Sequence, residues 1–440
     1  MRHERCELPG RGVLIRRVQE ALHIAGCAVD AALRHAAQAD APDGRGPDLE
    51  AGGFSANARP LVVRKVVAEA AMLLRCAAFL RDVDGQIKGA IDELAQRLVP
   101  SARGERLLTA LCLEPAFALD HAAAHIHLTA LGYRDAAVDR MLTEIFEDES
   151  LVAPERLPNH DLEHQWLKSI WLEDDYTEPA ALLARTCAAG PIDALAFRLH
   201  DIYAFAHVVL YASDMGRRAA QWPRPLRDVI GDVDAALAIA IDAENFDVAA
   251  ELIWTWPMLR LPWSPAASFS FRVLSAVQDT HGFLPGPEYS DEERDSMPED
   301  LRDEYVLRTS YHATLVMGFA CAAALRACPN QLLAVTPANK KGGAGDALLG
   351  SLRDQTTEPR WRDVFSRLDC SDRDLLTEFV FAIALRRAQV SNDLALLRDT
   401  LSLGLHCDMI EHPIARQALT LLRRANLLGK ISAARCVASA

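Results

Sequence analysis

The residues with the clearest chemical potential lie in the segment RLHDIYAFAHVVLYASDMG, residues 198–216, which reads as an apolar helix interrupted by ionisable side chains. His200 opens a polar stripe on this helix. At about 100° per residue, positions seven, eleven and fourteen further along return to within roughly 40° of it. These positions are His207, Tyr211 and Asp214. Polar side chains on an otherwise apolar helix require polar partners. We therefore expect this stripe to line a ligand cavity or to form a buried hydrogen-bonded network.

A second strongly apolar segment, residues 305–325, carries Tyr305 and His312 seven positions apart and so on nearly the same face. A histidine in such a segment is usually a core residue with satisfied hydrogen bonds. If both segments are inner helices of one fold, however, burial and neighbouring carboxylates tune the imidazoles for proton transfer. We therefore predict a converging set of catalytic acids and bases: His207, Asp214, Tyr305 and His312. The residues predicted to contact substrate beside them are His200, Tyr203, Tyr211 and Tyr311.

One acidic motif has the spacing of a metal site. In the stretch DDYTE, the residues Asp174, Asp175 and Glu178 follow a DDxxE pattern. Clustered carboxylates suit a Mg²⁺ ion that bridges a diphosphate, so we predict Mg²⁺ as the cofactor if the substrate is a diphosphate. The alternative is a solvated helix end, because carboxylates are mostly exposed.

Two pairs of histidines have the spacing of a zinc site. His121 and His125 are four residues apart, which places both imidazoles on one side of a helix. His160 and His164 repeat this spacing. Neither pair has the glutamate of an H-E-x-x-H motif, and no cysteine lies near either pair in the sequence. The sequence also lacks a P-loop, a G-x-S-x-G nucleophile elbow and the protein-kinase signatures, so we set those enzyme classes aside.

The charge of the chain limits its partners. The formal net charge is -14, whereas nucleic acids and anionic membranes attract basic surfaces, so we expect neither as a partner. The ten cysteines include no C-x-x-C pair, which favours free thiols in a reducing compartment. No run of about eighteen uncharged apolar residues is present. We therefore predict a cytoplasmic protein without membrane insertion that acts on a small molecule, and the sequence leaves its oligomeric state open.

Helical periodicity runs through the chain. Apolar residues recur at three- and four-residue spacing, and convincing period-two strands are absent, so we predict an all-α fold. A stretch rich in Gly, Pro and Asp divides the chain into an N-terminal helix in residues 1–38, a linker or loop in residues 39–58 and an all-α domain in residues 59–440. Paired helices can close into an (α/α) toroid or barrel, whose inner helices surround a central cavity. The polar stripe of residues 198–216 would line such a cavity.

One part of the sequence resembles the helix–turn–helix pattern of terpenoid-cyclase-type α/α toroids. It consists of residues 273–289, VLSAVQDTHGFLPGPEY, and the helix expected over residues 305–325. In that pattern a Gln lies a few residues before a Gly and an aromatic residue, which here are Gln278, Gly282 and Phe283. The Gln amide can bond backbone groups at a helix end, and Gly permits the tight turn. The wider arrangement also resembles uncharacterised bacterial helical proteins found among biosynthetic genes.

The resemblance implies an (α/α) toroid and a role in bacterial specialised metabolism. The cyclase motifs themselves are matched only in part. The Asp-x-Asp-Asp acid motif of one cyclase class begins here with Asp82 and Asp84 but ends in Gly85. The second magnesium motif of the other class begins with Asn392 and Asp393 but lacks the hydroxyl residue and the acid that should follow.

Three functions remain open at this point. The first is an enzyme of the α/α-toroid type that acts on a hydrophobic small molecule by lyase- or cyclase-like acid–base chemistry, with a terpene-cyclase-like variant that uses Mg²⁺. The second is a helical interaction protein that recruits a partner, and the third is a carrier that binds a ligand without converting it. We favour the enzyme, because the polar residues are concentrated on otherwise apolar helices.

Overall fold

The structure of the chain is a computed structural model that describes residues 9–39, 61–148, 150–151, 154–173, 180–327, 344–352 and 359–438. Every regular element within these ranges is a helix, which confirms the predicted all-α fold class. No disulfide bond involves the described residues Cys27, Cys76, Cys112, Cys187, Cys321, Cys370 or Cys407.

The α-helices of the first half of the chain are α1 (Arg11–Ala39), α2 (Val63–Ala77), α3 (Gly85–Arg103), α4 (Glu105–Leu113), α5 (Ala118–Thr129), α6 (Ala136–Glu147), α7 (Pro158–Leu172), α8 (Ala180–Leu183) and α9 (Leu199–Ser213). Those of the second half are α10 (Leu226–Asp242), α11 (Phe246–Ile253), α12 (Thr255–Met258), α13 (Pro265–His281), α14 (Asp291–Ser296), α15 (Glu299–Arg326), α16 (Ala344–Ser351), α17 (Trp361–Ser366), α18 (Cys370–Leu375), α19 (Thr377–Val390), α20 (Leu394–His406) and α21 (Pro413–Ala438). Short 3₁₀ helices are η1 (Ala78–Asp82), η2 (Pro115–Phe117) and η3 (Cys187–Ala189).

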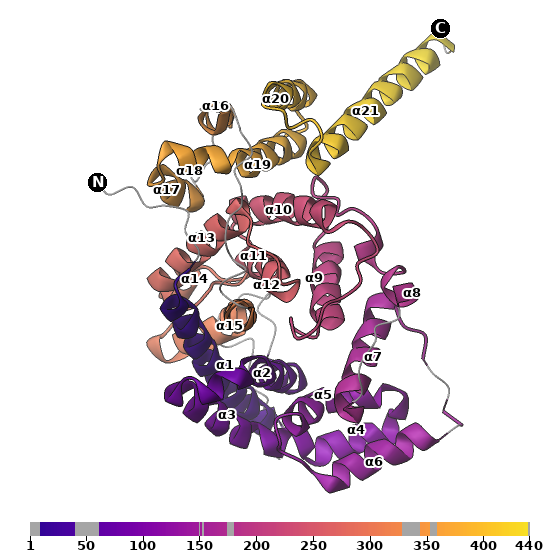
Figure 1. Cartoon of the computed structure of the whole chain (residues 1–440), viewed down its shortest axis with the longest axis vertical. Helices are drawn as coiled ribbons and strands as arrows, with labels where there is room; N and C mark the ends of the chain where they lie inside the picture. The colour runs from indigo at the N-terminus through magenta and orange to yellow at the C-terminus, as the bar shows by residue number, and fades with distance from the viewer. Residues whose placement is uncertain are drawn as a thin grey trace.

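Helices α2, α5, α7, α9, α11 and α15 form a closed circuit of contacts, in which each helix packs against the next and α15 returns to α2. Figure 1 shows these helices around the middle of the molecule. The central position of α15 follows from its sequence, because residues 313–325 are all buried and a helix that is apolar on every side must lie in a core. The circuit brings the polar residues of α9 and α15 to the same region.

Helix α1 belongs to the same core as the rest of the chain. It packs mainly against α15 and α2. The approach to α15 is close at Gly318, where an added Cβ would lie 2.3 Å from the Cβ of Ala21. A larger residue at this position would force the two helices apart. The expected N-terminal helix is therefore integral to the fold, and residues 40–58 of the predicted linker lie outside the described residues.

The predicted Gln-and-Gly turn lies at the end of α13. Gly282 adopts a left-handed conformation with φ of 79°, and its N–H donates a 2.8 Å hydrogen bond to the carbonyl of Gln278. Glycine adopts this conformation without steric cost. The Gln278 side-chain amide donates to Glu20 Oε2 at 2.7 Å. The glutamine therefore ties α13 to α1, whereas we had expected it to bond backbone groups at the helix end.

The C-terminal helices lie at one end of the molecule, as Figure 1 shows. Helices α19 and α21 pack against α10, which in turn packs against α11. The C-terminal helices thus support the circuit from outside and contribute no residue to the pocket that it encloses.

Within the described part of the chain, no single helix has both the length and the apolar character needed to cross a bilayer. One pair, Glu105–Leu113 with Pro115–Thr129, meets those criteria only when the two are joined across a bend of 114°.

Candidate functional site

A pocket of about 300 Å³, here called the central pocket, is lined by residues from every helix of the circuit. Its polar lining includes Glu69, Glu163, His207, Tyr211, Glu251 and His312. Its apolar lining includes Met72, Trp166, Leu210, Trp254, Val316 and Phe319. Known ligand pockets begin at roughly this size, so the central pocket suits a small molecule.

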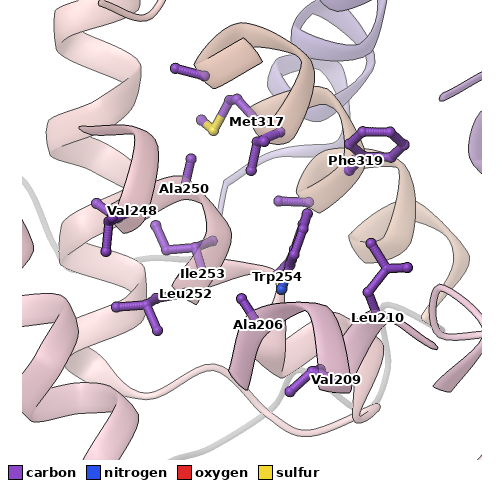
Figure 2. Packing of buried hydrophobic residues seen from close by; sticks show 14 of the residues in the cluster. Ala206, Val209, Leu210, Val248, Ala250, Leu252, Ile253, Trp254, Met317 and Phe319 are labelled. Atoms are coloured by element: carbon purple, nitrogen blue, oxygen red, sulfur yellow. The ribbon is translucent and has the colours of Figure 1, made fainter. Parts of the chain in front are cut away.

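The apolar end of the central pocket is built from three helices. Figure 2 shows Trp254 at the end of α11 beside Phe319 of α15 and Leu210 of α9. The rings of Trp254 and Phe319 are 6.3 Å apart in an edge-to-face arrangement, the geometry that aromatic quadrupoles favour. All three side chains are buried. This end of the pocket is therefore rigid and closed.

The other end of the central pocket is open to solvent. The side chains of Lys65 and His207 are 57% and 40% exposed, whereas that of Glu251 is 1% exposed. The pocket lining therefore includes exposed side chains, a buried carboxylate and buried aromatic rings.

His312 lies at the centre of a group of carboxylates on the inner side of the circuit. Its Nδ1 lies 3.2 Å from Glu69 Oε1 on α2, and its Nε2 lies 3.4 Å from Glu251 Oε1 on α11. Asp247 Oδ1, one turn before Glu251, is 3.9 Å from the same Nε2. We call His312, Glu69, Asp247 and Glu251 the imidazole cluster. One imidazole therefore joins α15 to both α2 and α11.

The ionisation of the imidazole cluster follows from these contacts. Burial alone would lower the pKa of His312, but the charges of Glu69 and Asp247 and the hydrogen bonds to Glu251 and Glu69 raise it well above its ordinary value. Burial alone would also raise the pKa of Glu69, but the charge and hydrogen bond of His312 and the charge of Lys65 outweigh it and lower that pKa. His312 is therefore an imidazolium opposite an ionised Glu69.

Tyrosines orient two carboxylates of the imidazole cluster. The Tyr203 hydroxyl donates a 2.7 Å hydrogen bond to Asp247 Oδ2, and the Tyr311 hydroxyl donates one to Glu69. Burial and the facing carboxylate raise the pKa of each tyrosine, so both hydroxyls keep their protons. Tyr203 and Tyr311 thus act behind the pocket and do not line it.

A second group of polar residues lines the pocket on α7 and α9. Glu163 accepts a hydrogen bond from the buried hydroxyl of Tyr211. The ring of Tyr211 lies 5.9 Å from that of His207, and His207 Nε2 lies 3.8 Å from Glu251 Oε1. Burial raises the pKa of Glu163, against weaker opposing effects of Tyr211 and His207. The pocket therefore contains two glutamates, Glu163 and Glu69, whose pKa values are moved in opposite directions.

Asp214 lies beneath the pocket and not in it. Helix α9 ends one residue earlier, and Asp214 has a left-handed backbone with φ of 46°, which turns its side chain away from the predicted stripe. Its carboxylate accepts two hydrogen bonds from Arg75, at 2.8 and 3.0 Å, and one from Trp166 Nε1 at 2.7 Å. Burial would raise the pKa of Asp214, but Arg75 outweighs burial and lowers it. Asp214 thus holds α2, α7 and the end of α9 together.

Two further predicted residues also lie away from the central pocket. His200, in the first turn of α9, is exposed. Tyr305 is buried two turns before His312 on α15, where its hydroxyl accepts a 2.9 Å hydrogen bond from the Ser290 N–H and donates one to Glu293 at 3.2 Å. Seven residues return to the same face of a helix but also advance about 10 Å along it. The predicted metal ligands Asp174, Asp175 and Glu178 lie outside the described residues.

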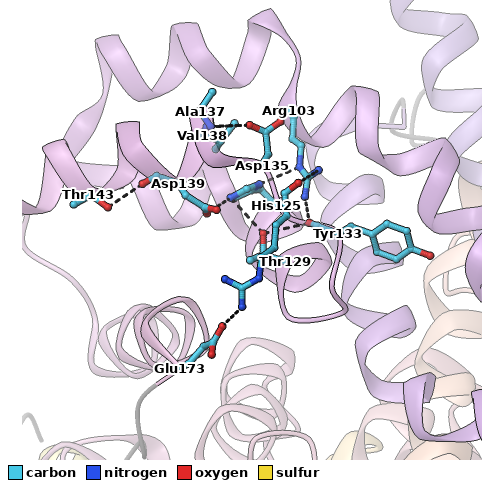
Figure 3. Close-up of polar contacts among 11 residues, drawn as sticks. Arg103, His125, Thr129, Tyr133, Asp135, Ala137, Val138, Asp139, Thr143 and Glu173 are labelled. Carbon is cyan, nitrogen blue, oxygen red and sulfur yellow. Dashed lines mark hydrogen bonds and ion pairs between the residues drawn. The ribbon is translucent and has the colours of Figure 1, made fainter.

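The histidine pairs with zinc spacing are placed differently from each other. Figure 3 shows His125 between Asp139 and Arg103, with His125 Nε2 2.9 Å from Asp139 Oδ1 and the Arg103 Nε–H donating to Nδ1 at 3.1 Å. His125 therefore contributes to packing. His160 lines the central pocket, and burial lowers the pKa of His164. Among the residues that the structure describes, no three or more His, Cys, Asp or Glu side chains are arranged to hold a metal ion.

The carboxylates of the imidazole cluster and Glu163 are not among the site residues that the sequence pattern predicts. Glu69 is an acid in the apolar helix α2, and Asp247 and Glu251 are four residues apart on α11, which is buried along its whole length. Two acids with i,i+4 spacing in a fully apolar helix are a signal that could have been used. Glu163 lies on α7 between His160 and His164, the second histidine pair.

Comparison with known proteins places the chain in a sequence family. A sequence-family model described as a domain of unknown function, DUF6895, matches residues 25–322. No curated protein and no solved structure matches the chain significantly. Every residue that lines the central pocket falls within the matched range, whereas α16 to α21 fall outside it. The family segment therefore contains the complete pocket.

The role of Asp214 leads to a stability prediction. Asp214→Ala leaves the buried Arg75 guanidinium without its carboxylate, so we expect the free energy of unfolding to fall by about 3–5 kcal/mol. Asp214→Asn tolerates the left-handed backbone and keeps an acceptor for Trp166, so its cost is expected to be smaller. Denaturant unfolding of both variants measures the difference. An alanine variant as stable as the wild type would contradict the structural role.

The imidazole cluster leads to a pH prediction. Because the folded-state pKa of His312 lies above its ordinary 6.5, protonated His312 stabilises the fold. This contribution is complete below pH 6.5 and is lost as the pH rises towards the folded-state pKa. We therefore expect the difference in Tm between the wild type and His312→Gln to shrink as the pH is raised above 6.5. His200→Gln, at an exposed site, is the control, and a difference independent of pH would contradict the ion cluster.

Proposed function

The chain belongs to the DUF6895 family, and we propose from its central pocket that it is an enzyme that transfers protons to and from a small molecule. The observation that carries the proposal is the placement of Glu163 and Glu69 in one pocket with their pKa values moved in opposite directions. Pairs of titratable groups separated in this way are how one site supplies both an acid and a base near neutral pH.

In this proposal Glu163 is the general acid. Its raised pKa keeps the proton to higher pH than an ordinary glutamate does, and the Tyr211 hydroxyl holds the carboxyl in place. A donor with a pKa nearer to the working pH transfers its proton more effectively in the transition state. Glu163 is within the pocket lining, so a bound molecule can receive that proton directly.

His207 is a second base of the pocket. It lines the pocket at the solvent-exposed rim, and its Nε2 faces Glu251 Oε1 at 3.8 Å. A carboxylate on one side of an imidazole stabilises the protonated form that appears when the imidazole accepts a proton. Glu69, which lines the same pocket and has a lowered pKa, is the carboxylate base of the pair described above, and His312 contacts Glu251 from the other side.

We also propose that the closed circuit of helices is the inner ring of an (α/α) toroid. Helices α1, α3, α10 and α13 pack on members of the circuit from outside, which supports an inner and an outer layer. The cavity at the centre is where such a fold binds its ligand. A role in bacterial specialised metabolism belongs to the same proposal and is supported by the resemblance of the α13 turn.

The terpenoid-cyclase-like version of this proposal takes two forms. In one, Glu163 protonates an unsaturated hydrocarbon that lies against Trp254 and Phe319. In the other, a diphosphate binds through Mg²⁺, because the carboxylates of the pocket would repel it without a cation. The second form uses Asp174, Asp175 and Glu178 and predicts that a chelator abolishes activity.

The enzyme proposal is tested without knowledge of the substrate by hydrogen exchange. We expect the wild-type protein, incubated in D₂O with a small-molecule extract of the cells that make it, to add deuterium to one compound or to convert it. Glu163→Gln and His207→Gln are each expected to slow this reaction by about 10² to 10⁴, the usual contribution of one acid or base. Mass spectrometry of the extract measures the change.

Glu20→Gln is the matched control, because Glu20 also accepts hydrogen bonds in an ion pair but lies on α1, outside the pocket. Its rate should equal that of the wild type. A compound that the protein retains and releases unchanged, with no deuterium incorporated, would contradict the enzyme and indicate a carrier.

A further inference from the structure

We propose that the molecule bound in the central pocket carries a protonated amine, whose N–H groups donate to the carboxylates of Glu69 and Glu251 while its carbon skeleton lies against the aromatic end. This inference rests on the proposed function, since it names the chemical class of the ligand that the same pocket takes. The following contacts support it.

The first support is the charge balance of the imidazole cluster. The carboxylates of Glu69, Asp247 and Glu251 all face a single cation, His312, within 3.9 Å. Lys65 is 3.6 Å from Glu69, but it is 57% exposed and lies at the rim. Buried carboxylates are costly unless they are paired. The interior of the pocket thus has more acids than cations, and a cationic ligand would correct the imbalance.

The second support is a set of acceptors without donors. Glu251 Oε2 and Asp247 Oδ1 are buried and have no hydrogen-bond partner. Glu251 lines the pocket and its side chain is 1% exposed, so solvent does not reach it freely. Buried acceptors are normally satisfied. Unpartnered carboxylate oxygens call for N–H donors, which a primary or secondary amine has and a quaternary ammonium lacks.

The third support is the surface beyond these acceptors. Trp254 and Phe319 close the pocket, and Trp166 stacks 5.1 Å from Tyr211. Aromatic rings attract cations placed against their faces and also pack well against hydrocarbon. A molecule with an ammonium group at one end and an apolar body at the other therefore matches both parts of the lining.

Other classes of ligand fit these contacts less well. An anion would meet the carboxylates of Glu69 and Glu251 on two different helices. A neutral alcohol would donate one hydrogen bond but would leave the charge unbalanced. A bare metal ion would compete with His312, whose ring already occupies the space between Glu69 and Glu251.

The test uses three probes of equal shape and different charge: 2-phenylethylamine, 2-phenylethanol and phenylacetate, titrated calorimetrically into the full chain in an amine-free buffer. We expect the amine to bind at least about tenfold more tightly than either of the others, as a charge-assisted hydrogen bond provides. Glu251→Gln removes the charge but keeps the shape, and we expect it to weaken amine binding by at least about tenfold. Glu20→Gln, outside the pocket, should bind the amine like the wild type.

Folding of each variant is checked by its thermal transition, and Glu69→Gln serves as the second pocket variant if Glu251→Gln does not fold. Equal binding of the three probes, binding of phenylacetate or Mg²⁺ alone in preference to the amine, or no binding of the amine at all would overturn the inference. Amine binding that Glu251→Gln does not weaken would overturn it too. The proposed function fails separately, if the amine binds as expected but wild type and Glu163→Gln show the same absence of proton exchange.

Discussion

The central pocket depends on one partly buried cation, the imidazolium of His312. It is the contact through which α15 meets carboxylates of both α2 and α11, at Glu69 and Glu251. Ionised carboxylates cannot lie together in a protein interior without a positive partner, because burial opposes their charge. His312 therefore allows several acids to gather on the inner side of the circuit. The other polar residues of the pocket lie near the acids that His312 holds together.

Chemistry and packing are divided between two layers of this region. The layer that faces the pocket contains Glu163, Tyr211 and His207, which a ligand can reach. The layer beneath contains the Asp214 and Arg75 ion pair, which is buried and fully occupied with its own hydrogen bonds. The Asp214 and Arg75 ion pair fixes the ends of α2 and α9. The fold therefore stays stable although a carboxylate on the pocket side lacks a hydrogen-bond partner. Incomplete satisfaction of polar groups at one place is typical of a binding site.

The sequence was sufficient for what local periodicity determines. It predicts helices throughout, and it identifies His207 and His312 as polar residues on apolar helices, which the structure places in one pocket. Periodicity does not locate the end of a helix, so Asp214 was assigned to a face that its left-handed backbone leaves. Periodicity shows which face of a helix a residue lies on but not how far along the axis it is. It therefore groups Tyr305 with His312 although two turns separate them. The i,i+4 spacing of Asp247 and Glu251 marks two acids on a buried helix, but only tertiary packing determines that Glu251 lines the pocket.

The most direct test of the account is a carbon-13 NMR titration of the glutamate carboxyl groups in the ligand-free protein, with Glu163→Gln and Glu69→Gln spectra to assign the two signals. The account predicts that Glu163 titrates above the ordinary glutamate pKa of 4.5 and Glu69 below it. In the His312→Gln variant the Glu69 signal should move up towards that value, because its cation is gone. Two carboxyls that titrate together at the ordinary pKa, with or without His312, would contradict the separation of acid and base on which the proposed function depends.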